Sequence, residues 1–195
     1  RQPMALVRDG RYRHRLAAGL ASLWMGAGAS AQQAGPCSAL LEADFRSLPD
    51  APTTLERAEE IPAADGLPAH CRVRGRIPPE VNFELQVPVA GTWNGKFLMQ
   101  GCGGLCGAAR PETAEDALAR AYAVVTTDMG HVGEPWEAAW AHDNLEAEID
   151  FAYRATHVVA VAAKAIIATY HGRGPQQSYF RGCSTGGRQG LIAAQ

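Results

Sequence analysis

A serine with a glycine two residues away on either side lies in the stretch RGCSTGGRQG, residues 181–190 of the 195-residue chain. Gly182, Ser184 and Gly186 form the Gly-x-Ser-x-Gly pattern of a nucleophile elbow, a tight, strained turn between a strand and a helix. In such a turn only glycine leaves space on each side, and the strain holds the serine hydroxyl out at the top of a sheet. A helix beginning at Thr185 would direct its free N–H groups to the same point. We therefore predict that Ser184 is a nucleophile.

The pattern alone is weak evidence for a nucleophile, because a chain with 21 glycines can match it by chance. Its context is more specific, since we expect an apolar strand over 177–181 and a helix from residue 185 onward. The alternative interpretation is a glycine-rich surface turn that carries an inert serine.

A serine nucleophile needs a histidine to accept its proton and an acid to orient that histidine. In α/β-hydrolases both partners follow the serine in the chain, but residues 185–195 contain neither Asp nor His. His131, His142 and His157 all precede Ser184, and we expect His157 to be solvated on the polar face of a helix. The sequence thus predicts an incomplete catalytic triad and the N-terminal part of a longer enzyme.

Two backbone N–H groups should stabilise the oxyanion that forms during acyl transfer. One is the N–H of Thr185, directly after the nucleophile, and the other should come from a loop after an earlier strand. The glycine cluster at 101–104 follows the short apolar run 97–99 and occupies that place. A flexible turn is the alternative for this cluster. The cluster does not match a dinucleotide-binding fingerprint, because Cys106 stands where the third glycine is required.

The elements that must position these residues follow from periodicity and turn signals. We expect antiparallel strands at 72–77 and 82–89, a buried run at 97–99, a helix at 112–120, a β-branched strand at 122–127, a long helix at 148–170, a strand at 177–181 and a helix from 185. The alternation of strands and helices predicts an α/β fold built on a mostly parallel sheet.

The long helix has one apolar face, which we predict to be formed by Phe151, Ala155, Val158, Ala162, Ala165 and Thr169. Asp150 and Arg154 are spaced as a favourable pair on the opposite, polar face.

The chain divides into three predicted parts. Residues 1–31 have a basic start, an apolar stretch at 16–28 and an Ala29-Ser30-Ala31 cleavage site, which together predict a secretory signal peptide; a membrane anchor is the alternative. Residues 32–70 are proline-rich and predicted to be irregular. Residues 71–195 are predicted to be an incomplete catalytic domain.

Composition and cysteine content narrow the class of protein. With 47% hydrophobic and 19% charged residues and a net charge of -2, the chain is an ordinary globular protein without a basic face for nucleic acid. Cysteines in an exported protein are expected to form disulfides. Cys37 and Cys71 can close a loop, and Cys102 and Cys106 can bridge locally at the cost of strain. Cys183 is left over, so we expect its partner to lie outside this sequence.

Four stretches, LPAHCRVRGRI, WNGKFLMQGCGG, VVTTDMGH and SYFRGCSTGGRQG, resemble the tannase and feruloyl esterase family. The resemblance implies the α/β-hydrolase fold, truncated just after the nucleophile elbow. It implies that Ser184 is the acyl-accepting nucleophile and that Thr185 and Gly104 supply the oxyanion N–H groups. It also implies that Cys183 bonds a downstream cysteine beside the catalytic histidine, and it supports a Cys37–Cys71 disulfide. The family's lid domain, with its calcium site, would lie beyond these residues, which should hold no metal or cofactor.

The resulting prediction is a secreted or periplasmic serine esterase. Its substrates would be small-molecule esters of aromatic acids such as gallate, ferulate or terephthalate half-esters, with no nucleic-acid partner and no stable membrane span. Alternatives are an α/β-hydrolase for aliphatic esters or peptides, and a non-catalytic secreted binding domain. We interpret Asp128 and His131 as structural, whereas Trp136 and Trp140 fit either a pocket for an aromatic group or packing.

Overall fold

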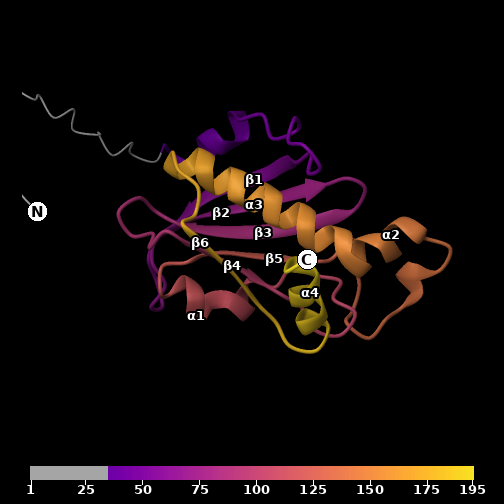
Figure 1. Ribbon diagram of the computed structural model, residues 1–195. Coiled ribbons are helices and arrows are strands. Elements are labelled where there is room, and N and C mark those ends of the chain that lie inside the picture. Colours follow the sequence, from indigo (N-terminus) through magenta and orange to yellow (C-terminus); the bar gives the residue numbers. More distant parts are fainter. Residues whose placement is uncertain (1–34) are drawn as a thin grey trace, which may run out of the picture. The chain divides into compact units, whose positions relative to one another are not determined.

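The structure, a computed structural model, describes residues 35–195, and the predicted signal peptide lies outside the described residues. The described residues form a six-stranded sheet with helices packed on it (Figure 1). The strands are β1 (Thr54–Ile61), β2 (His70–Ile77), β3 (Val81–Pro88), β4 (Lys96–Gln100), β5 (Ala123–Thr127) and β6 (Gln177–Arg181). The helices are α1 (Glu115–Leu118), α2 (Leu145–Ile149), α3 (Ala155–His171) and α4 (Thr185–Ala193), with 3₁₀ turns at Cys37–Glu42, Pro111–Ala114 and Ala139–Ala141 and a π turn at Asp150–Arg154.

The strand order β1-β2-β3-β5-β4-β6 makes the sheet mixed. β1, β2, β3 and β5 pair antiparallel to one another in turn, whereas β4 is parallel to both β5 and β6. A parallel pair requires a crossover connection, which α1 supplies between β4 and β5 and α3 supplies between β5 and β6. The parallel strands therefore form the half of the sheet that leads to the Gly-x-Ser-x-Gly turn.

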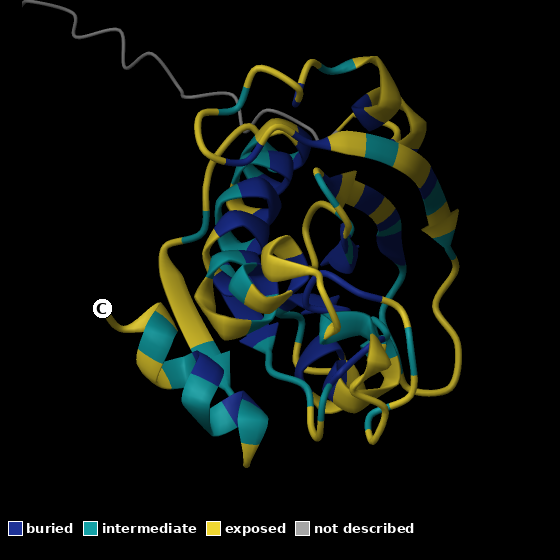
Figure 2. Ribbon diagram, turned by 90° about the vertical axis from the view of Figure 1, so that its right-hand side faces the viewer, coloured by how far each residue is buried: buried dark blue, intermediate teal, exposed yellow. Residues whose placement is uncertain are grey.

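The two faces of the sheet are covered by different helices. Successive side chains of a strand point to opposite faces, so Phe97 and Met99 face one side and Leu98 the other. The first side packs against α3, and the second packs against α1 through Leu118. The central strands are consequently buried on both faces, as the dark blue interior in Figure 2 shows, and they fix the strand ends that carry the site.

Residues 32–70 were predicted to be irregular, but the structure places strand β1 within them. β1 is an edge strand with mostly exposed side chains, and Ala58 is its buried residue. The strand pairs with β2 through backbone hydrogen bonds, which do not depend on its side chains. Its sequence does not show the polar–apolar alternation that predicts strands. The Cys37–Cys71 disulfide attaches the preceding 3₁₀ turn to β2.

The predicted long helix is confirmed, but its buried stripe differs from the expectation in its second half. Val158 and Ala162 are buried as predicted, whereas Thr169 is exposed and the buried positions there are Ile166 and Ile167. The predicted spacing of 4, 3, 4, 3 and 4 residues has the 3.6-residue period of a helix, so the period is right and the buried stripe is centred on a neighbouring side of the helix in this half.

Asp150 was predicted to lie on the polar face of this helix, and this prediction is wrong. The carboxylate is 1% exposed and accepts a hydrogen bond from Arg154 Nη1 at 2.6 Å. The π turn breaks the helical register on which the prediction rested, because a π turn holds more residues than an α turn.

By length and composition, the continuous helix Leu145–His171 can cross a membrane. In the structure it contributes the buried stripe that covers the sheet (Figure 1).

Candidate active site

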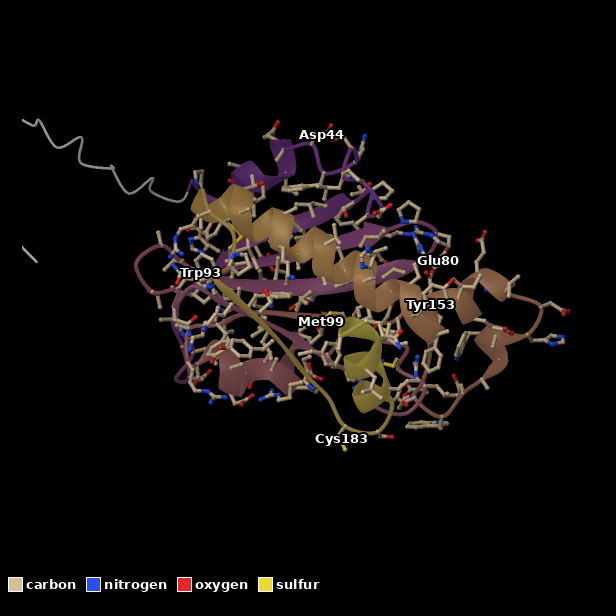
Figure 3. All side chains as sticks on the ribbon, viewed as in Figure 1. Asp44, Glu80, Trp93, Met99, Tyr153 and Cys183 are labelled. Carbon is tan, nitrogen blue, oxygen red and sulfur yellow. A yellow bond between two sulfur atoms is a disulfide. The ribbon has the colours of Figure 1, made fainter. Side chains whose placement is uncertain are left out.

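Ser184 lies in the turn between β6 and α4, where the sequence predicted it. Its backbone has φ 55° and ψ -122°, a conformation that non-glycine residues rarely adopt. The residue is exposed, and neighbouring Cys183 projects from the tip of the same turn in Figure 3. The strained turn therefore presents the serine at the surface, directly before the first residue of a helix.

The glycines of the pattern are required by close backbone contacts. A Cβ atom at Gly182 would lie 2.4 Å from the carbonyl carbon of Gly186, which is far inside contact distance. A Cβ at Gly101 would lie 2.8 Å from Gly186 Cα, and one at Gly186 would lie 3.1 Å from the carbonyl oxygen of Cys102. The turn, the start of α4 and the loop after β4 thus meet at a point where only glycines fit.

The loop at residues 101–107, named here the glycine loop, is attached to the nucleophile turn. Thr185 Oγ1 donates a hydrogen bond to the carbonyl oxygen of Gly104 at 2.6 Å. Gly104 has φ 57°, and a Cβ there would lie 2.4 Å from Pro135 O. Neither the Thr185 N–H nor the Gly104 N–H donates a hydrogen bond to another residue that the structure describes. Both N–H groups are therefore without an acceptor within residues 35–195.

The glycine loop is not the flexible turn considered as an alternative. The Cys102–Cys106 disulfide closes it, as the sequence suggested. Backbone hydrogen bonds join it to β6 and to the segment that follows β5: Gly101 N to Arg181 O at 2.8 Å, Leu105 N to Pro135 O at 2.7 Å, Gly107 N to Asp128 O at 3.1 Å, and Gly133 N to Gly107 O at 3.0 Å. These bonds hold the loop at the carboxyl ends of the parallel strands.

Arg181, the last residue of β6, anchors the strand that leads to the turn. Its guanidinium donates to both carboxylate oxygens of Asp116 at 2.7 Å and to Gln100 Oε1 at 2.6 Å. The hydrogen bond from Arg181 lowers the pKa of Asp116 to about 2. Sequence reasoning missed this bidentate pair because 65 residues separate its members, beyond the reach of any local spacing rule.

Arg188, one turn into α4, contacts the long helix. It donates to the carbonyl oxygens of Phe151, at 2.8 Å, and of Ala152, both in the π turn, and its guanidinium lies 4.7 Å from the centre of the Phe151 ring. Carbonyl groups of a helix that bulges in this way are open to an outside donor. Arg188 therefore fixes the start of α4 against the helix that crosses the sheet.

Side chains in the segment that follows β5 make hydrogen bonds and ring contacts within the fold. Asp128 Oδ1 accepts hydrogen bonds from the backbone N–H groups of Asn82, at 3.0 Å, and Gly130, at 2.9 Å, and Oδ2 accepts from Asn82 Nδ2 at 2.6 Å. His131 is buried and stacks on Trp140 with ring centres 3.8 Å apart. Trp136, in contrast, is 75% exposed. The contacts support the structural interpretation of Asp128, and they place Trp140 in packing.

Asp128 gives the fold a testable pH dependence. Burial raises its pKa to about 6, above the ordinary value of 3.8, so the folded state binds this proton more tightly than the unfolded chain. The stability from Asp128 is therefore complete below pH 4 and is lost as the pH rises through 6. We expect the free energy of unfolding of the wild type to fall by about 2 kcal/mol relative to Asp128→Asn between pH 4 and 7. Urea unfolding of both proteins across this range measures the difference, and a constant difference would contradict the prediction.

A cavity of about 110 Å³ lies against the glycine loop. It is lined by Gln100, Gly101, Cys102, Gly103, Cys106, Ala108, Arg110, Thr113, Thr126, Thr127 and Pro135. The hydroxyl of Thr126 is buried there and has no hydrogen-bond partner among the residues that the structure describes. The cavity is thus at the carboxyl ends of β4 and β5, where α/β sheets bind ligands.

None of the candidate histidines is joined to Ser184 by a hydrogen bond within residues 35–195. His131 is buried within the segment after β5, and His142 and His157 are exposed, as expected for His157. Cys183 is exposed and unpaired within the same described range. Within the described residues, Ser184 and the glycine loop therefore lie together without a histidine hydrogen-bonded to the serine.

Known proteins resemble this chain in sequence. The family model described as tannase and feruloyl esterase matches residues 67–195. An uncharacterized esterase of Xanthomonas campestris is 36% identical over 167 residues, which cover 78% of this chain and 29% of that protein. The mono(2-hydroxyethyl) terephthalate hydrolase of Piscinibacter sakaiensis is 34% identical over 189 residues, covering 82% of this chain and 31% of the hydrolase.

A solved structure shows the same fold. The crystal structure of feruloyl esterase B from Aspergillus oryzae matches with a TM-score of 0.67 and 29% sequence identity, over 73% of this chain and 31% of that one. This match confirms the predicted α/β-hydrolase fold class, and the chain spans about a third or less of the length of these relatives. From the family match over residues 67–195, the chain belongs to the tannase and feruloyl esterase family.

Proposed function

We propose that the full-length protein carrying this chain is a serine esterase that hydrolyses esters of aromatic carboxylic acids through an acyl-enzyme on Ser184. The observation that carries the proposal is the strained, exposed Ser184 directly before α4, with Thr185 hydrogen-bonded to Gly104 of the glycine loop. The relatives support the substrate class, because a feruloyl esterase and a mono(2-hydroxyethyl) terephthalate hydrolase are both named for esters of aromatic acids.

In the proposed reaction the Ser184 hydroxyl oxygen attacks the ester carbonyl carbon and its proton passes to a histidine supplied by a segment beyond residue 195. The carbonyl oxygen becomes an oxyanion that accepts hydrogen bonds from Thr185 and Gly104. The bond to the alcohol then breaks, and the alcohol leaves with the proton from the histidine. Water repeats the sequence on the acyl-enzyme, releasing the aromatic acid and restoring the serine.

Cys183 fits this proposal as an attachment point. Its thiol is exposed at the turn beside Ser184. We propose that it forms a disulfide with a cysteine from the segment that supplies the histidine, because such a bond would hold base and nucleophile together. The two disulfides already present support a secreted or periplasmic location, since disulfides persist in oxidising compartments.

Labelling with a fluorophosphonate tests the nucleophile. The full-length protein should gain one phosphonyl group on the peptide that contains Ser184, detected by mass spectrometry, because the reagent reacts with activated serines. No adduct at this residue would contradict the proposal and would favour a non-catalytic binding domain.

A substrate panel tests the aromatic class. Methyl gallate, methyl ferulate and mono(2-hydroxyethyl) terephthalate should be hydrolysed faster than aliphatic methyl esters and peptides by the full-length protein. The 195-residue chain alone should be close to inactive on all of them, because it lacks the proposed base. Faster hydrolysis of the aliphatic esters would overturn the aromatic assignment while leaving the serine mechanism in place.

A further inference from the structure

Gln189 is a buried polar residue of α4 whose side chain faces the glycine loop. It is 1% exposed and follows Ser184 by five residues. Its Oε1 accepts a hydrogen bond from the backbone N–H of Cys102 at 3.3 Å. Its Nε2 donates to Cys102 Sγ at 3.1 Å and to Cys106 Sγ at 3.4 Å. Both ends of the amide therefore contact the disulfide-closed part of the glycine loop.

The glycine loop is shaped to admit this side chain. A Cβ atom at Gly101 would lie 2.9 Å from Gln189 Oε1, in addition to its clash with Gly186. The side chain consequently reaches the disulfide through space that a glycine leaves open. Gln189 and the glycine loop form one packed unit, although 83 to 87 positions separate them in the chain.

The contacts restrict where the glycine loop can lie. Disulfide sulfurs are weak hydrogen-bond acceptors, and the bond from Cys102 N is long, so no single contact dominates. A buried amide left without partners is unfavourable, however, and the amide of Gln189 finds its partners only while the disulfide lies against α4. Gly104 lies between the two bridged cysteines, so its N–H is placed by the same constraint.

We propose that Gln189 is a positioning residue of the oxyanion site: it holds the disulfide-closed glycine loop against α4 and so sets the Gly104 N–H relative to Ser184. The inference rests on the proposed esterase function for its catalytic consequence, whereas the positioning itself can be measured without activity. Gln189 lies in α4, the helix that begins directly after Ser184, so under this proposal one element fixes both the nucleophile and its oxyanion donor.

Hydrogen exchange of the full-length protein tests the positioning directly. In Gln189→Leu, peptides that cover residues 101–107 should exchange about tenfold faster, because the loop opens more often. Peptides from β2 and β3 should be unchanged. The matched control is Gln195→Leu, which makes the same chemical change at an exposed position. Equal exchange of the glycine loop in both variants would overturn the proposal.

Kinetics of the full-length protein on methyl ferulate test the catalytic consequence. We expect Gln189→Leu to lower kcat by about 10- to 100-fold with KM within about twofold, since an oxyanion donor acts mainly in the transition state. In a C102S/C106S background the same substitution should cost less than about threefold, because the loop is already released. Full additivity of the two changes would contradict the proposal.

A loss of folding in Gln189→Leu would also lower kcat, so a second, more conservative variant is needed. Gln189→Glu keeps the acceptor for Cys102 N–H and loses the donor to the sulfurs, so its exchange and its kcat should fall between those of the wild type and Gln189→Leu. A kcat and a loop exchange rate for Gln189→Glu equal to those of the wild type would contradict the role of the sulfur contacts. An inactive wild type would refute the esterase function, and the exchange data would still decide the role of Gln189.

Discussion

Replacing Ser184 with alanine is expected to lower kcat/KM of the full-length protein on aromatic esters by about 10⁴- to 10⁶-fold, since no acyl-enzyme can form. The fold should survive, because the residue is exposed and its hydroxyl is not needed for the turn. Steady-state hydrolysis of methyl ferulate, with circular dichroism to confirm folding, measures both effects.

Ser178→Ala is the matched control for this loss. Ser178 is an exposed serine on β6, six residues before Ser184, and its substitution should change the rate by less than about twofold. Ser184→Gly adds a second comparison, since glycine adopts a φ of 55° without strain and should stabilise the turn while also abolishing activity. Retention of even a tenth of the wild-type rate in Ser184→Ala would show that another residue is the nucleophile.

Gly182→Ala is expected to have the second-largest effect, because its new methyl group would lie 2.4 Å from both the carbonyl carbon and the carbonyl oxygen of Gly186. These are backbone atoms at the start of α4, so the helix start or the turn must move. We expect a loss of at least about 2 kcal/mol in unfolding free energy and about 100-fold in kcat, since small displacements of the nucleophile are costly. Denaturant unfolding and ester hydrolysis give the two values.

Gly187→Ala provides the control in the same helix. Nothing lies within 4 Å of a Cβ atom at Gly187, so alanine should stabilise α4 by about 0.5–1 kcal/mol through its higher helix propensity. If the two variants behaved alike, the close contact at Gly182 would not be what constrains this turn.

Local sequence signals sufficed for the nucleophile turn and most of the elements around it. The strand at 177–181 and the helix from residue 185 are each recognised from a few neighbouring residues, and the glycines between them reflect a steric requirement of the turn itself. The same holds for strand β5, whose uninterrupted β-branched run fits its burial on both faces.

Local signals failed where a residue depends on a distant partner. β1 is a strand because β2 lies beside it, although its own side chains are mostly exposed. Asp150 is buried because a π turn interrupts the helical period, which no simple periodicity anticipates. The first error came from prolines and the absence of alternation in residues 32–70, and the second came from a helical period applied across the π turn.

From the sequence alone, the turn that presents Ser184 and the order of the elements around it could be determined, because both depend on short-range sterics and hydrophobic periodicity. Only the tertiary structure decided what holds the site in place. Arg181 finds Asp116 across 65 positions, and Gln189 finds Cys102 across 87 positions. Such pairs come together only when the chain folds, and their residue types and spacing do not reveal the pairing. A hydrogen-bonding side chain has many equivalent partners in the sequence, and the packed core excludes all but one.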